Sequence, residues 1–277
     1  MIIGFLGKGG SGKSTLSTGM VNYSHRNGNK VLAVDADHNM DLSYNLGYED
    51  GGPFIGGSFL PLREEFGLDI KKPTEDIFVG DVTSKRFSFT KPDNYSKKHT
   101  VRIEDDLYLM MSGPQSDLVL HGSHCSHSLA APLKIYLPLL ELNDDEVVVV
   151  DEKASVDAVS TGIPTGFDLA VIVAEPRIHS IRVAKQIKEM LEWFDVPNIV
   201  VLNKSNSKDD IKIFKKEFGQ NPFVVLDSCK DPLSENKNIN KACGVLFQEL
   251  SNCKKNTKTR LDRTILKYKR NSNFQKK

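Results

Sequence analysis

A glycine-rich loop near the start of the chain carries the residues with the clearest chemical role. Gly7 to Ser14 fits the pattern G-x-x-x-x-G-K-[ST], and it lies between a short apolar run and a segment with helical periodicity. Such loops surround phosphate groups with backbone N–H groups, and the following helix directs its positive end at the same phosphates. The sequence therefore predicts a nucleotide site with these phosphate-binding residues: Gly9, Gly10, Ser11, Gly12, Lys13, Ser14 and Thr15.

Three side chains of this loop are expected to act separately. Lys13 reaches the β- and γ-phosphates, the Ser14 hydroxyl binds Mg²⁺, and Thr15 lies beside the α-phosphate. The alternative is a glycine-rich turn that binds nothing. Because so many matching positions between a strand and a helix rarely arise from background glycine content, we favour ATP with Mg²⁺ as the ligand.

Acidic residues stand at the ends of two apolar runs farther along the chain. Asp35 and Asp37 follow one run, and Asp151 closes another. Side chains two residues apart at a strand end point the same way, so Asp35 and Asp37 can face Mg²⁺ and an attacking water. Asp151 is predicted to hold Mg²⁺ through water, with Asp35 behind the ligands of the ion. The alternative for Asp35 and Asp37 is an ordinary polar strand end.

Asn203 ends a further apolar run and is predicted to lie near the base. Its side-chain amide can pair with the N6 and N7 edge of adenine, as asparagine does when it reads adenine in DNA. A single asparagine at a strand end is common, so this prediction depends on the phosphate loop.

Histidine and cysteine gather in one short segment, His121 to His127, between a predicted strand and a helix. Thiolate with imidazole is a ligand set for Zn²⁺ or Ni²⁺. Cys125 and His127 could supply two donors from one chain, with His124 beside them, and two chains could supply four. The alternative is a polar loop whose histidines are solvated.

The elements that must position these residues alternate along the chain, because short β-branched runs are separated by segments of helical periodicity. This alternation predicts an α/β fold with a mostly parallel β-sheet covered by helices on both faces. The predicted strands are Ile2 to Leu6, Val31 to Asp35, Leu107 to Ser112, Glu146 to Asp151, Leu169 to Ala174, Ile199 to Asn203 and Phe223 to Leu226. The predicted helices are Lys13 to Asn27, Ile178 to Phe194, Asp209 to Phe218 and Asn240 to Asn252.

Composition and length indicate one ordinary domain over residues 1–253. Within it, residues 49–106 are rich in Gly, Pro and charge, and we expect an irregular insertion with one helix near Leu60 to Phe66. No signal peptide fits at Met1, and no apolar run is long enough for a membrane span. The scattered cysteines form no C-x-x-C pair, so we expect a cytoplasmic protein.

Residues 254–277 form a strongly basic tail. They contain ten Lys and Arg and one acidic residue, whereas residues 1–253 contain 27 basic and 35 acidic residues. One side of a short helix there could bind an anionic surface or membrane through Leu261, Ile265, Leu266 and Tyr268. The alternative is a frayed, solvated terminus, which we favour because the apolar face is short.

The phosphate loop resembles that of a known group of ATPases. Lys8 to Ser14 is similar to the K-G-G-x-G-K-[ST] loop, the deviant Walker-A loop of the MinD, ParA and nitrogenase iron-protein group of P-loop NTPases. The resemblance implies that Lys8 crosses a dimer interface to the partner's nucleotide, so that ATP holds a homodimer together. It also implies that Asp37, in a segment similar to D-x-D-P-N, orients the attacking water, although His38 replaces the proline. Catalytic roles are thus expected for Lys8, Lys13, Asp37 and Asp151.

Further segments resemble the same group. Asp151 to Ser155 stands where the group has D-x-x-A-G, and Ser155 replaces a glycine that contacts the γ-phosphate, which leaves the hydrolysis rate open. Asn203-Lys204 is similar to a base-reading N-K or N-R, and Asp231-Pro232 is similar to a later D-P that packs near the base. The resemblance implies an ATPase that prefers ATP to GTP.

The cysteine–histidine segment resembles that of the CooC-type carbon monoxide dehydrogenase nickel-insertion ATPases. In that family a C-x-C loop follows a strand that carries M-G. Here Met111-Ser112-Gly113 precedes the loop, and Cys125-Ser126-His127 occupies the C-x-C position. Phe87-Ser88-Phe89, and Pro92 to Tyr95 with His99, are similar to the segment before that strand. The resemblance implies a metal held between two chains and a client metalloenzyme.

Three functions remain open. We favour a CooC-like maturation factor that loads metal into a client enzyme. The second is a MinD/ParA-like switch that binds a membrane or nucleic acid through its basic tail. The third is an iron–sulfur electron-donor ATPase, which needs two cluster cysteines per chain, whereas only Cys125 is placed for one.

Overall fold

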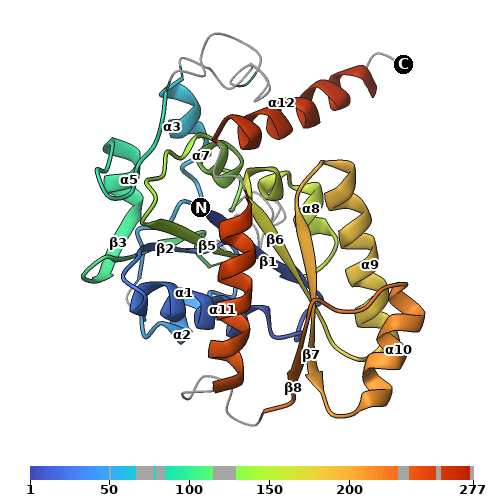
Figure 1. The fold of residues 1–277 in the computed structure, drawn as a ribbon. Helices are drawn as coiled ribbons and strands as arrows, with labels where there is room; N and C mark the ends of the chain where they lie inside the picture. Colours follow the sequence, from blue (N-terminus) through green and yellow to red (C-terminus); the bar gives the residue numbers. More distant parts are fainter. Residues whose placement is uncertain are drawn as a thin grey trace.

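The strands of the computed structural model join in one sheet, which Figure 1 shows at the centre of the molecule. The structure describes residues 1–49, 51–66, 78, 85–114, 129–229, 237–253 and 257–274. Among these, eight strands lie in the order β3-β4-β2-β5-β1-β6-β7-β8, and all neighbours are parallel except β3 and β4. The strands are β1 Ile2–Gly7, β2 Lys30–Asp35, β3 Thr100–Glu104, β4 Leu107–Met111, β5 Glu146–Asp151, β6 Leu169–Ala174, β7 Asn198–Ser205 and β8 Val224–Asp227.

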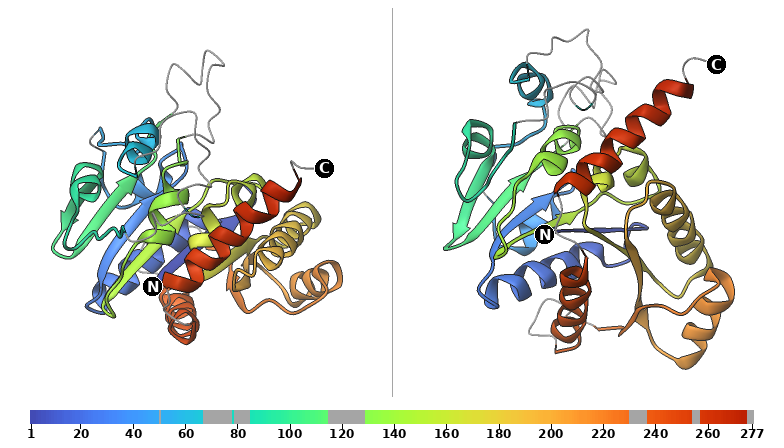
Figure 2. Two further views of the ribbon diagram at one scale, coloured as in Figure 1. Left: turned by 90° about the horizontal axis from the view of Figure 1, so that it is seen from above. Right: turned by 45° about the horizontal axis from the view of Figure 1, so that its top comes forward.

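Helices cover both faces of this sheet, which confirms the predicted α/β architecture (Figures 1 and 2). Successive valines of β5 belong to different cores, because Val147 packs with α1 and α11 whereas Val148 packs with α7 and α9. Burial on both faces explains why the central strands are almost wholly apolar. The helices are α1 Lys13–Arg26, α2 Asp41–Asn45, α3 Phe59–Glu64, α5 Asn94–His99, α7 Leu133–Leu139, α8 Asp157–Ser160, η3 Ile163–Gly166, α9 Ile178–Trp193, α10 Lys208–Phe218, α11 Lys237–Asn252 and α12 Thr257–Phe274.

The predicted strands and long helices are all present, with bounds that differ by a few residues. The expectation of little regular structure in the insertion beyond its first helix is wrong, because α5 and the edge strand β3 lie within residues 94–104. Strand β3 pairs antiparallel with β4, and Val101 and Ile103 of β3 pack against the core of α1 and α11. The sequence of these five residues does not predict a strand by itself, because β3 is stabilised by its pairing with β4.

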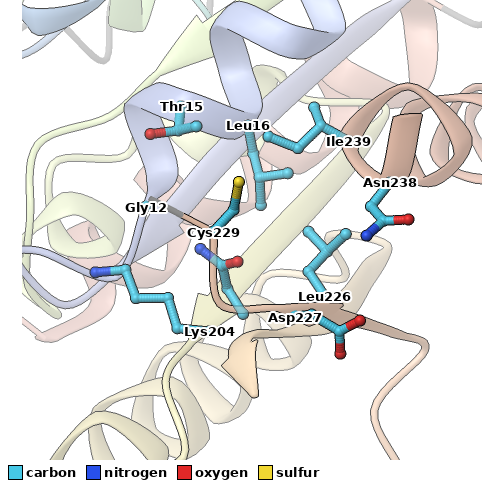
Figure 3. A pocket seen from close by; sticks show the side chains of 10 residues that line it. Gly12, Thr15, Leu16, Lys204, Leu226, Asp227, Cys229, Asn238 and Ile239 are labelled. Carbon is cyan, nitrogen blue, oxygen red and sulfur yellow. The ribbon is translucent and has the colours of Figure 1, made fainter. Parts of the chain in front are cut away.

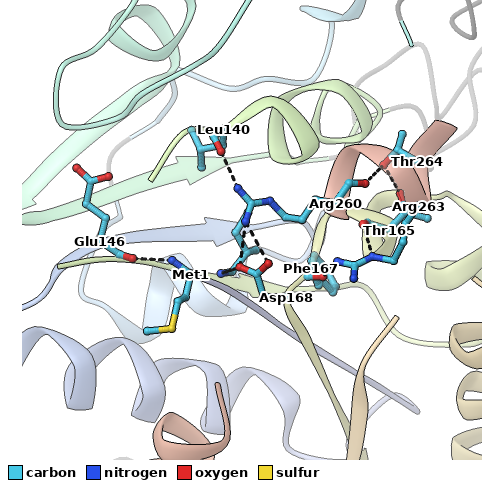
Figure 4. Close-up of polar contacts among 10 residues, drawn as sticks. Met1, Leu140, Glu146, Thr165, Phe167, Asp168, Arg260, Arg263 and Thr264 are labelled. Atoms are coloured by element: carbon cyan, nitrogen blue, oxygen red, sulfur yellow. Dashed lines mark hydrogen bonds and ion pairs between the residues drawn. The ribbon is translucent and has the colours of Figure 1, made fainter. Parts of the chain in front are cut away.

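The expectation of a frayed, solvated C-terminus is also wrong for the residues that the structure describes. Helix α12 runs past α7 and η3, as Figure 2 shows, and Arg260 is 2% exposed. Figure 4 shows its guanidinium between Asp168, at 3.1 Å, and the Leu140 carbonyl, at 2.8 Å. Arg263 donates to the carbonyls of Thr165 and Phe167. The basic residues therefore anchor the helix to the body.

None of the helices in the described part of the chain combines the length and the apolar character that a membrane span requires.

Candidate nucleotide-binding site

Two glycines with special backbone geometry shape the loop between β1 and α1. Gly7 has a φ of +151°, and a Cβ there would lie 2.3 Å from the Val173 carbonyl oxygen. Gly12 has a φ of +95°, and a Cβ there would lie 2.2 Å from the Asn203 amide nitrogen. Neither position has room for a side chain, so the loop passes close to β6 and β7. Between them, Ser11 N–H donates to the Lys8 carbonyl at 3.1 Å and closes a tight turn.

The first turn of α1 holds the predicted phosphate ligands. Lys13 is 6% exposed, and its positive charge lies near enough to Asp151 to lower the pKa of that carboxyl. The carbonyl of Ser14 accepts hydrogen bonds from the hydroxyls of Ser17 and Thr18, at 3.0 and 2.6 Å. Lys8 and the following two glycines are exposed at the tip of the loop. The tip is thus open to a ligand or a second chain, while Lys13 faces the carboxylates.

Strand register brings the predicted carboxylates together. Asp35 of β2 and Asp151 of β5 are paired residues at the carboxyl ends of adjacent parallel strands. Both side chains are fully buried, and the nearby charges of Asp35 and Asp37 each raise the pKa of Asp151. The three carboxylates that the sequence predicts therefore lie in one cluster beside the phosphate loop.

Asp35 is held by hydrogen bonds from within the chain. Its Oδ2 accepts from the backbone N–H and the hydroxyl of Ser43, both at 2.8 Å, and its Oδ1 accepts from the Asp37 N–H at 3.3 Å. Burial nevertheless raises its pKa to about 6, and the Ser43 bonds offset part of that shift. This geometry fits a supporting carboxylate behind the ligands of an ion.

Asp151, in contrast, has two buried carboxylate oxygens that find no hydrogen-bond partner among the described residues. Burial raises its pKa to about 7, and the nearby Ser14 hydroxyl, although outside hydrogen-bond geometry, opposes the shift. Unsatisfied buried carboxylate oxygens are costly, and a divalent cation with its waters would satisfy them. Ser14 and Asp151 therefore fit Mg²⁺, which would offset phosphate charge there.

The carboxylate of Asp37 lies at the rim of the cluster and is oriented by the next residues. Its Oδ1 lies 3.3 Å from His38 Nδ1 and accepts from the Asn39 N–H at 3.2 Å. His38 thus contacts Asp37 directly at the position where the resembling group has proline. A carboxylate held in this way can orient a water next to the ion.

Glu152 is a site residue that the sequence analysis does not single out. It is 1% exposed, and neither of its carboxylate oxygens has a hydrogen-bond partner in the part of the chain that the structure describes. Burial, followed by the Asp151 charge, raises its pKa to about 8. Burial also lowers the pKa of Lys134 at the start of α7, while the Glu152 charge raises it. The only sequence signal for Glu152 is an acid directly after the β5 aspartate.

A pocket beside the loop, lined in part by the predicted base contact Asn203, is the candidate base pocket, and Figure 3 shows its lining. Gly12, Thr15 and Leu16 form one wall, and β8 and α11 form the opposite wall. Asn203 also lines the pocket, and its Nδ2 donates to the Ser11 carbonyl at 2.8 Å, which leaves its Oδ1 and one amide proton for a base. The sequence analysis misses the residues of the opposite wall, which are Leu226, Asp227, Cys229, Asn238 and Ile239.

Several predicted residues lie outside the described part of the chain. These are the base-packing residues Asp231 and Pro232 and the metal-ligand candidates His124, Cys125 and His127. Within the described residues, no group of three or more His, Cys, Asp or Glu side chains is arranged to hold a metal ion. Cys243 is fully buried in the core against α1, so it is not placed for a cluster.

Comparison with protein families agrees with this geometry. The family model described as the CobQ/CobB/MinD/ParA nucleotide binding domain matches residues 2–243. ATP-binding protein MJ0084 of Methanocaldococcus jannaschii is 28% identical over 256 residues, which cover 91% of this chain and 94% of that protein. The carbon monoxide dehydrogenase accessory protein CooC of Rhodospirillum rubrum is 25% identical over 217 residues, which cover 76% of this chain and 77% of CooC.

Solved structures share the fold at lower identity. The cell division ATPase MinD of Pyrococcus furiosus superposes with a TM-score of 0.57 at 18% identity, covering 90% of this chain and 98% of MinD. A plasmid partition protein of Borrelia burgdorferi bound to AMPPNP gives a TM-score of 0.56 at 15% identity, with 90% of this chain and 98% of that protein covered.

Proposed function

Because this chain belongs to the CobQ/CobB/MinD/ParA nucleotide-binding family and is therefore a P-loop ATPase, we propose that ATP and Mg²⁺ close it into a homodimer that serves the maturation of a client metalloenzyme. The observation that carries the Mg²⁺–ATP site is the buried, unpartnered carboxylate of Asp151 beside Lys13 and Ser14. The client role is supported by the similarity to CooC across most of both chains.

Each predicted residue has one task in this proposal. Lys13 balances phosphate charge, Asp37 orients the attacking water, and Asn203 contacts adenine. Lys8 is exposed at the loop tip and is thus available to the phosphates of a partner's nucleotide. We place the protein in the cytoplasm, and the absence of a disulfide at Cys243 and Cys253 among the described residues agrees with a reducing compartment.

The nucleotide part is tested by two substitutions. Lys13→Ala should abolish ATP and ADP binding in calorimetry. Lys8→Ala should leave ADP affinity unchanged and prevent the ATP-dependent dimer in light scattering. A Lys8→Ala protein that still dimerises with ATP would refute the role of Lys8 across the interface.

The metal part is tested by Cys125→Ala combined with His127→Ala. The wild-type protein purified with ATP and Mg²⁺ should hold one Zn²⁺ or Ni²⁺ per dimer, and the double variant should hold none. Cys253→Ala is the matched control, since it removes a thiol outside both the metal segment and the base pocket. Equal metal content in wild type and double variant would remove the maturation role.

The two alternatives have less support. A switch that uses its basic tail on a membrane or nucleic acid would need Arg260 and Arg263, which are buried against the body. An iron–sulfur electron donor would need a second cluster cysteine. None of the described cysteines is available, because Cys243 is buried, Cys253 packs against the core, and Cys229 lines the base pocket.

A further inference from the structure

Two consecutive residues of β7 bond to two consecutive carbonyls of the phosphate loop. Asn203 Nδ2 donates to the Ser11 oxygen at 2.8 Å, and Lys204 Nζ donates to the Gly10 oxygen at 2.5 Å. The partners are 192 and 194 residues apart in the chain. The loop is therefore fixed from outside by a strand that belongs to a different part of the fold.

Glu175 holds the Lys204 ammonium from the other side. Its Oε1 lies 2.8 Å from Lys204 Nζ, and the Glu175 side chain is 11% exposed, compared with 44% for Lys204. The Glu175 N–H donates to the Ser180 hydroxyl at 3.0 Å, which ties it to the start of α9. Glu175 is thus well positioned, and the Lys204 ammonium contacts both the Glu175 carboxylate and the phosphate loop.

The backbone of Lys204 has a strained conformation at the position that contacts the phosphate loop. Its φ is +59°, in the left-handed region, where the Cβ of a residue with a side chain comes too close to the following carbonyl oxygen. Strain of this kind persists where surrounding contacts impose it, and it concentrates at functional sites. Here the imposing contacts are the bonds of Lys204 to Gly10 and Glu175.

The two contacts determine where the N–H groups of the loop point. In a trans peptide the C=O and the N–H point in opposite directions. Holding the Gly10 carbonyl on Lys204 directs the Ser11 N–H to the other side, where it donates to the Lys8 oxygen. Holding the Ser11 carbonyl on Asn203 directs the Gly12 N–H away from β7 in the same manner.

We propose that Glu175 and Lys204 form an electrostatic brace that positions the phosphate loop, and that the brace sets the affinity for the phosphates whichever base is attached. This inference rests on the nucleotide site proposed above. It gives Lys204 a positioning role that is separate from base reading.

The test compares Lys204→Met, Glu175→Gln and Lys204→Arg with the wild type. Lys212→Met is the matched control, because Lys212 forms an exposed pair with Asp209 on α10 at 2.8 Å. Calorimetry with ADP, GDP and pyrophosphate in Mg²⁺ gives the affinities. Lys204→Met should weaken ADP and pyrophosphate alike, roughly tenfold, as expected for loss of a charged hydrogen bond. The ratio of ADP to GDP affinity should stay constant, and Lys204→Arg should recover most of the loss.

Unchanged pyrophosphate affinity in Lys204→Met would overturn the brace, and so would a change confined to the ADP to GDP ratio. If Lys204→Met does not fold, Glu175→Gln decides, because it keeps the side-chain shape and removes only the counter-charge. Lys13→Ala separates the two levels. If Lys13→Ala still binds pyrophosphate, the proposed nucleotide site is wrong. If Lys13→Ala no longer binds pyrophosphate but Lys204→Met binds it normally, the nucleotide site stands and only the brace is rejected.

Discussion

Ser155 has the backbone of a glycine. Its φ is +94°, and its N–H donates to the Gly7 carbonyl at 3.0 Å, which joins the segment after β5 to the start of the phosphate loop. The sequence analysis marks this residue because the resembling ATPases have glycine there. Ser155 thus has the left-handed backbone conformation that a glycine would adopt without strain. The strained residue lies in a segment that contacts the phosphate loop.

Ser155→Gly should relieve that strain. The gain in the free energy of unfolding is expected to be about 1 kcal/mol, because relief of the left-handed backbone outweighs the greater freedom of glycine in the unfolded chain. Denaturant titration measures it, and ATPase turnover should change in the same variant. Ser155→Ala is the control, since it stays strained. Equal stability of the two variants would show that the position is not strained.

His99 makes the protein sensitive to mild acid. His99 is 6% exposed, and its ring packs on Tyr95 at 4.6 Å between centroids. No described residue forms a hydrogen bond with its Nδ1. Burial, followed by the Lys98 charge, lowers the pKa of His99, although the Phe54 backbone and Glu65 oppose this. Below about pH 6.5, His99 is therefore protonated in the unfolded chain while it stays neutral in the folded chain. Protonation stabilises the unfolded chain, so the free energy of unfolding decreases as the pH falls.

His99→Gln should remove that loss. We compare the free energy of unfolding of the wild type with that of the variant at each pH. As the pH is lowered from 7 to 5, the wild type should lose stability relative to the variant, by about 1.4 kcal/mol for each pH unit by which the pKa of His99 is lowered. Thermal unfolding of both proteins across this range measures it. His179→Gln, on the exposed start of α9, is the control. A constant difference across the range would show that His99 titrates normally.

At the scale of elements, the sequence predicts the central strands well because they are buried on both faces. The run Glu146 to Asp151 has the bounds of β5 itself, and it ends on Asp151, the carboxylate that we propose for Mg²⁺. Helix α7 is not predicted, since Leu133–Leu139 is short and contains Pro138, and its stability comes from tertiary packing, against η3 and α12 and through Tyr136 on Phe87. The wall of the base pocket is unpredictable for a similar reason, because α11 reaches the loop only through the tertiary fold.

Helix α12 depends on one buried ion pair. Arg260 and Asp168 are each 2% exposed at their side chains, and Asp168 Oδ2 also accepts from the Ile2 N–H at 2.8 Å. Arg260→Met should lower the free energy of unfolding by about 3–5 kcal/mol, because it leaves a buried charge without its partner. Chemical denaturation measures this loss.

A control and a rescue accompany this prediction. Arg102→Met breaks an exposed pair with Asp105 and should cost no more than about 1 kcal/mol. Adding Asp168→Asn to Arg260→Met removes the orphaned charge and should recover part of the loss. If Arg260→Met is as mild as Arg102→Met, the pair does not anchor the helix.

At the scale of the whole molecule, the nucleotide site and the Arg260 anchor of α12 lie at opposite ends of the parallel strands. The phosphate loop follows the carboxyl end of β1, whereas Arg260 reaches Asp168 at the amino end of β6. Of the four apolar residues predicted to face a membrane, Leu261 and Tyr268 belong to the core, Ile265 packs against it, and Leu266 is half-buried. Lys267 also donates to the Ser160 carbonyl at 3.3 Å, so Arg260, Arg263 and Lys267 are turned inward, whereas Lys269 is exposed.

Anionic vesicles should therefore not recruit the protein through this helix. Membrane binding by α12 would require Leu261, Tyr268 and the Arg260 ion pair to leave the core, so the contacts that hold this helix to the body would be lost. Co-sedimentation of the intact protein with phosphatidylserine vesicles, in ATP and Mg²⁺, should match a vesicle-free control. Arg260→Met, which loosens the helix, should pellet more than wild type. ATP-dependent pelleting of the intact protein that disappears when residues 254–277 are deleted would reverse this conclusion, since the tail would then leave the body to bind.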